Sequence, residues 1–303
     1  MLPFPSLSGA PLGARQPKGF LIPLSLPSHY SVIFSFRRST SWVYSVLAQS
    51  VAVVLLLSTG CHVSQTKRPR PISEGSVQSL RLELPPSLEH ERSEYESEVL
   101  KGLDEVANFF RSSGFELPSQ KLIESVLVFD SSSKGREYMV REYGAPLKSI
   151  PETFSGTVEG RRLLLVSHES YREIWRKLYS EWPWTDKTYH QLIVHELAHR
   201  AHEAISISRF GSADAMGPPW FFEGLAVVCA GQFETDQPPM SREEMEKQVG
   251  LGRTPKASYP LYGRIVRSLV AEFGMKTLIP KASEQGFPEI LWSNQVMHKP
   301  GKK

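Results

Sequence analysis

The residues best suited to chemistry lie in one short segment, residues 195–199, which reads His-Glu-Leu-Ala-His. Residues four apart on a helix point in nearly the same direction, so His195 and His199 can hold one metal ion through their imidazole rings. Glu196 follows the first histidine and can reach a water molecule bound to that ion. Its neighbours, residues 192–194 and Leu197, are apolar and predict that this helix is buried, where an unpaired charge would be costly.

Glu223 is a third candidate ligand, in the segment 218–226 that reads Pro-Pro-Trp-Phe-Phe-Glu-Gly-Leu-Ala. The two prolines predict the start of a helix, with Glu223 in its first turns. An acidic residue among aromatic and small side chains needs a partner, and a metal ion would supply one. Two histidines and one glutamate suit zinc and leave its fourth position open for water, as expected of a catalytic site.

Hydrophobic periodicity predicts the elements that must position these residues. Strands are expected over residues 125–129 and 163–166, and helices over residues 93–113, 169–180, 186–204 and 259–273. A further helix should begin at a capping box in residues 241–244 and stop at Gly250. A few strands followed by helices indicate an α+β fold, and the sequence has no internal repeat and no phosphate-binding glycine loop.

Residues 195–199 and 220–226 together resemble the gluzincin zinc metallopeptidases, particularly the peptidase MA-like group, which are relatives of thermolysin and the zinc aminopeptidases. Ser258-Tyr259 and the end of the predicted helix at residues 273–274 are similar to that group's final segment. The resemblance is specific over residues 190–275, extends less specifically over 93–189 and is absent before residue 92. It implies a zincin-like catalytic domain with a small mixed sheet, an HExxH active-site helix and a C-terminal helical part.

The resemblance also implies a role for each residue of the site. His195, His199 and Glu223 would bind Zn2+, and Glu196 would act as general base and then as proton shuttle. The reaction would be hydrolysis of a peptide bond by a zinc-activated water, on a peptide or protein substrate. The flanking His190 and His202 are expected to be solvated helix residues rather than ligands.

A tyrosine often supplies the oxyanion donor in this family, and Tyr259 matches it by position, with Tyr262 in reserve. The alternative for Tyr259 is a core aromatic residue. Residues 163–166 lie about 30 residues before His195, where zincins have the edge strand that pairs with an extended peptide.

Two features depart from the family pattern. Val227 stands where thermolysin-like members have a carboxylate that orients a metal ligand, so the orienting partner must lie elsewhere, and the sequence does not name it. The Gly-x-Met-Glu-Asn motif that grips a substrate α-amine is absent. Aminopeptidase specificity is therefore not supported.

The first 60 residues are expected to be a leader. Arg37 and Arg38 precede an apolar stretch, residues 42–57, and the segment closes on Leu-Ser-Thr-Gly before Cys61. This pattern is typical of an export signal, and its end resembles the lipobox of bacterial lipoproteins, in which Cys61 would be lipidated. The alternative is a single N-terminal transmembrane anchor. Either reading places the rest of the chain outside the cytoplasm, on the periplasmic side of a membrane in the cell envelope.

After the leader we expect a tether over residues 61–92, a metallopeptidase domain over 93–285 and a tail over 286–303. The formal net charge of +3 arises in the leader, which holds four basic and no acidic residues. The remaining 31 basic and 32 acidic residues nearly cancel, so a nucleic-acid partner is not supported. A second hypothesis is a catalytically silent zinc- and peptide-binding envelope protein, although such a scaffold has no use for Glu196 as a base.

Overall fold

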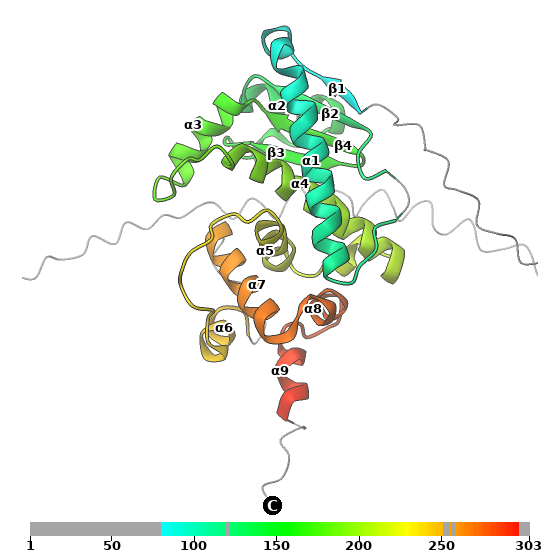
Figure 1. The fold of residues 1–303 in the computed structure, drawn as a ribbon, viewed down its shortest axis with the longest axis vertical. Coiled ribbons are helices and arrows are strands. Elements are labelled where there is room, and N and C mark those ends of the chain that lie inside the picture. The colour runs from blue at the N-terminus through cyan, green and yellow to red at the C-terminus, as the bar shows by residue number, and fades with distance from the viewer. Residues whose placement is uncertain (1–79, 119–120, 251–254, 256–257, 297–303) are drawn as a thin grey trace, which may run out of the picture.

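The computed structural model describes residues 80–118, 121–250, 255 and 258–296. Helices surround a small four-stranded sheet in the order β1-β2-β4-β3 (Figure 1). Three strands run parallel, and β3 is antiparallel to β4. The strands are β1 (Arg81–Glu83), β2 (Ser125–Phe129), β3 (Gly156–Glu159) and β4 (Arg162–Val166). The predicted α+β class and the small mixed sheet are therefore confirmed.

The strand over residues 163–166 lies inside the sheet, between β2 and β3, so its assignment as the edge strand is wrong. All four of these residues are buried, as a continuous apolar run in an interior strand should be. The edge strands of the sheet are β1 and β3, and β3, which has the sequence Gly-Thr-Val-Glu, is only half-buried. So short a strand, without an apolar run or a full alternation, gives little periodic signal.

The first set of helices packs around the sheet (Figure 1). α1 buries one face, including Tyr95, Val99 and Phe110, and packs on α4. Serine side chains cap the starts of α2 and α3 at Ser131 and Ser167. These elements are η3 (Pro86–Glu91), α1 (Arg92–Ser112), α2 (Ser132–Tyr143), η4 (Leu147–Ser149), α3 (His168–Leu178) and α4 (Thr188–Phe210).

The second set lies on the other side of α4, away from the sheet (Figure 1). The predicted capping box of α6 is present, with Ser241 and Glu244 each binding the other's backbone N–H. These elements are η5 (Ala213–Met216), α5 (Pro219–Cys229), α6 (Arg242–Val249), α7 (Tyr259–Phe273), α8 (Met275–Ala282) and α9 (Glu289–Val296).

Two glycines let α5 and α7 approach closely. A Cβ atom added to Gly224 would lie 2.6 Å from the backbone oxygen of Tyr262, and one added to Gly263 would lie 2.4 Å from Cγ1 of Val227. Both distances are shorter than any ordinary carbon contact. Because Gly224 directly follows Glu223, this close approach of α5 and α7 lies beside a candidate ligand.

Ordered elements extend beyond both predicted domain boundaries. β1 pairs with β2, although residues 61–92 were expected to be a tether. Leu291 and Trp292 of α9 are buried in the core, although residues 286–303 were expected to be a tail. Within the described ranges, no helix combines the length and apolar character needed to cross a bilayer. The predicted leader and Cys61 lie outside those ranges.

Candidate metal centre

The central helix α4 is buried along most of its length because it lies between the sheet and the second set of helices. His195 is 4% exposed, and Glu196 and His199 are each 9% exposed. The prediction of a buried helix carrying this motif is confirmed. Polar side chains in such a place must find partners or bind an ion.

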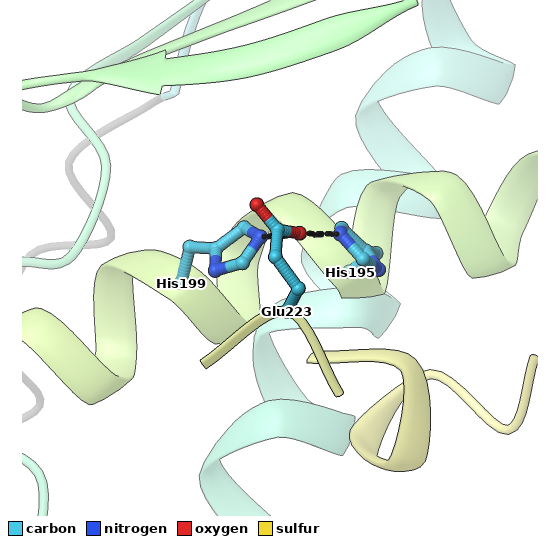
Figure 2. Close-up of side chains that lie close together, drawn as sticks. All are labelled: His195, His199 and Glu223. Carbon is cyan, nitrogen blue, oxygen red and sulfur yellow. Dashed lines mark hydrogen bonds and ion pairs between the residues drawn. The ribbon is translucent and has the colours of Figure 1, made fainter. Parts of the chain in front are cut away.

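The partners come together at one point. Figure 2 shows His195 and His199, both from α4, pointing at the carboxylate of Glu223 on α5. Nε2 of His195 lies 3.4 Å from Oε2 of Glu223, and Nε2 of His199 lies 3.2 Å from the same oxygen. The two Nε2 atoms are 3.1 Å apart. The structure therefore gathers the three predicted ligands, and together they could hold a metal ion.

The separations among these three atoms fit one ion. Tetrahedral zinc with bonds of about 2.0–2.2 Å keeps its ligand atoms about 3.3–3.6 Å apart. The observed separations of 3.1–3.4 Å are close to that range. Two imidazole nitrogens and a carboxylate are all acceptors when unprotonated, so a positive charge, either a metal ion or protons on the histidines, stabilises their close grouping.

The two carboxylates of the site differ in electrostatics. Burial raises the pKa of Glu196 to about 7; His195 opposes the rise and the charge of Glu223 adds to it. Burial also acts to raise the pKa of Glu223. The charge of His199 and the polar contacts with both histidines outweigh burial and lower this pKa to about 2. The surroundings therefore favour the ionised form of Glu223 and disfavour that of Glu196.

A cleft opens beside these residues. Glu196 and the three candidate ligands line it together with the edge strand β3 and part of α3. Tyr259 also lines the cleft, and its ring centre is 5.4 Å from that of His195. Tyr262 is buried and does not line the cleft. Of the two predicted tyrosines, Tyr259 is thus the one that lines the cleft with the three candidate ligands.

One polar partner of His195 was not predicted from the sequence. Oε1 of Gln232 lies 2.9 Å from Nδ1 of His195. Gln232 follows α5 and belongs to no motif, and only the preceding Gly231 hints at a turn there. Its placement depends on tertiary packing, which no local pattern in the sequence reports.

The predicted exposure of His190 and His202 is wrong. His190 is buried between α4 and α1, where it contacts Glu98 through Nδ1 and Glu105 through Nε2 at 3.0 Å. His202 is 1% exposed, with its ring near those of Phe110 and Phe221. Neither residue joins the three candidate ligands.

Comparisons of the chain with protein-family models, with curated proteins and with solved structures give no match. What the site can do is therefore inferred from its own residues and geometry.

Proposed function

We propose that this protein is a zinc-dependent metallopeptidase with a zincin-like catalytic domain of the gluzincin type. The observation that carries the proposal is the convergence of His195, His199 and Glu223 on one point, with Glu196 beside them in an open cleft. Two histidines and one glutamate are a ligand set of catalytic zinc sites. Sites that only stabilise a fold usually have four protein ligands.

When bound, zinc supplies a Lewis acid that polarises a carbonyl group and lowers the pKa of a coordinated water. Glu196 accepts a proton on its carboxylate and later returns it to the leaving amine. Burial shifts the pKa of Glu196 toward neutral pH, which is the direction that suits a group that both accepts and returns a proton. Tyr259, on the wall of the cleft, would donate from its hydroxyl to the oxygen that gains charge.

The edge strand β3 supports a peptide as the substrate. One side of β3 pairs with β4, and the strand also lines the cleft. A Cβ atom added to Gly156 would lie 3.3 Å from Cγ of Glu196, so this strand passes directly beside the proposed base. An extended peptide that adds to β3 through backbone hydrogen bonds would carry its own carbonyl groups past Glu196.

The decisive experiment measures zinc and cleavage together. We expect the purified protein to contain about one zinc per chain and to cleave casein or a mixed-peptide library. Glu196→Gln should keep the zinc and lose cleavage, because it removes the base without removing a ligand. Glu173→Gln, an exposed change on α3, is the matched control. Firm zinc binding by the unaltered protein without cleavage of a broad library would favour the silent binding protein.

We further propose that the domain acts outside the cytoplasm as a cell-envelope lipoprotein attached through Cys61, with a single N-terminal anchor as the alternative. The support is the sequence of the leader. Cells fed a labelled fatty acid should incorporate it into this protein, and Cys61→Ser should abolish the label. Label that persists in Cys61→Ser would contradict lipidation.

A further inference from the structure

The contacts of Gln232 fix which way its side chain points. Gln232 is 3% exposed, and its amide nitrogen Nε2 donates to the backbone oxygen of Gln191 at 3.4 Å. A backbone oxygen only accepts, so the amide group faces Gln191 and the side-chain oxygen faces His195. The 2.9 Å contact with His195 is then a hydrogen bond in which Nδ1–H of the ring donates.

We propose that Gln232 is the positioning residue of this metal centre: it holds His195 in the tautomer with hydrogen on Nδ1, so that Nε2 presents its lone pair to a metal ion. The inference rests on the proposed metal site and adds the partner that the sequence leaves open. In many metal sites a carboxylate or a backbone carbonyl has this role, and here a neutral amide takes it.

The turn that carries Gln232 is held from several elements. Gln191 of α4 donates from Nε2 to the backbone oxygen of Gly231 at 2.8 Å. Arg267 of α7 donates to the backbone oxygens of Gln232 at 3.2 Å and of Phe233 at 2.9 Å. Hydrogen bonds therefore hold the backbone around Gln232 to α4, which carries the two histidines, and to α7, which begins at Tyr259.

Phe233 adds a third attachment. Its φ of 52° is left-handed, a conformation that a residue with a side chain rarely adopts without compensation. The ring stacks on Trp175 of α3 at 5.2 Å with an angle of 3° between the planes, and it also contacts Trp182. This packing offsets the backbone strain of Phe233. The turn at Phe233 also directs the side chain of the preceding residue, Gln232, toward His195.

Two substitutions separate orientation from packing. Gln232→Met keeps the length of the side chain and removes the acceptor, whereas Gln232→Glu keeps an acceptor for Nδ1–H. The control is Gln237→Met, an exposed change in the same loop. Loss of an orienting partner typically weakens metal binding about 10- to 100-fold. We expect that loss in Gln232→Met, affinity within about 3-fold of the unaltered protein or tighter in Gln232→Glu, and no change in Gln237→Met.

The first measurement is competition for zinc between the full chain and a chromophoric chelator, with a circular dichroism melt of each variant. Unchanged zinc affinity in a folded Gln232→Met would overturn the proposal. The second measurement needs neither zinc nor activity: nitrogen-15 NMR of the metal-free protein should show His195 with hydrogen on Nδ1, and Gln232→Met should lose that preference. A neutral His195 ring with its hydrogen on Nε2 alone in the unaltered protein would also overturn it. Zinc binding without peptide cleavage would contradict the proposed peptidase and leave the role of Gln232 standing.

Discussion

Replacement of His202 by leucine should make the protein less sensitive to acid. Neither ring nitrogen of His202 has a hydrogen-bond partner among the described residues, and the side chain is 1% exposed. Burial, with a smaller contribution from His199, lowers the pKa of His202 from 6.5 to about 3. In the folded protein this ring therefore stays neutral far below the pH at which it takes up a proton in the unfolded chain.

The sign and the size follow from proton linkage. Between about pH 6.5 and 3 the unfolded chain binds a proton that the folded protein does not, so acid favours unfolding across that window. Integrated from pH 7 to pH 5, this one group removes about 2 kcal/mol from the free energy of unfolding. His202→Leu has nothing to protonate, and its side chain suits the apolar surroundings of Phe110 and Phe221.

The assay is urea unfolding followed by tryptophan fluorescence at pH 7, 6 and 5, on metal-free protein. The difference in unfolding free energy between His202→Leu and the unaltered protein should grow by about 2 kcal/mol in favour of the variant over this range. Using the difference cancels the other titrating groups common to both proteins. Two curves that stay parallel within about 0.5 kcal/mol would refute a neutral, unbonded His202, because such a residue must give this slope.

Three further predictions concern the site and its supports. Gly224→Ala should lower the free energy of unfolding by about 1–3 kcal/mol, because the Cβ atom of the new alanine would meet the backbone of Tyr262. An unchanged thermal unfolding curve would contradict the close packing of α5 and α7. In a peptide assay, Tyr259→Phe should lower kcat about 100-fold or more with little change in KM. Tyr262→Phe should leave kcat unchanged. Equal effects of the two substitutions on kcat would argue against Tyr259 as the donor. Removal of zinc with a chelator should lower the free energy of unfolding by about 2.7 kcal/mol relative to protein at a free zinc concentration of 100 Kd. In Glu223→Gln, the same removal of zinc should lower it much less. An equal loss of stability in the variant and in the unaltered protein would exclude Glu223 as a ligand.

The elements with strong periodicity could be predicted from the sequence. The apolar positions of α1 recur at three- and four-residue spacing, and the helix has almost the expected bounds. The same holds for α7, which ends before Gly274 as predicted. The three candidate ligands could also be predicted, because two of them lie one helical turn apart and the third is an acidic residue in an apolar helix, where a charge needs a partner.

The missed elements are short or depend on distant residues. β1 has three residues and becomes a strand through its pairing with β2, and β3 has four. The burial of His202 was missed because α4 is buried around most of its circumference, and a helix without a polar face gives no periodic clue to which residues are exposed.

The predicted site was incomplete for the same reason. Gln232 is aimed at His195 by a turn that Arg267, distant in the sequence, helps to hold. The edge strand could have been placed correctly, because the apolar run in residues 163–166 is itself typical of an interior strand and is a better guide to its position than the family resemblance.

We propose that this chain uses Glu196 as a base beside a zinc ion held by His195, His199 and Glu223. The most direct test compares zinc content and peptide-library cleavage in the purified protein and in Glu196→Gln. We expect about one zinc per chain in both proteins, with cleavage only in the unaltered one. Cleavage that survives in Glu196→Gln, or an unaltered protein that binds no zinc, would contradict it.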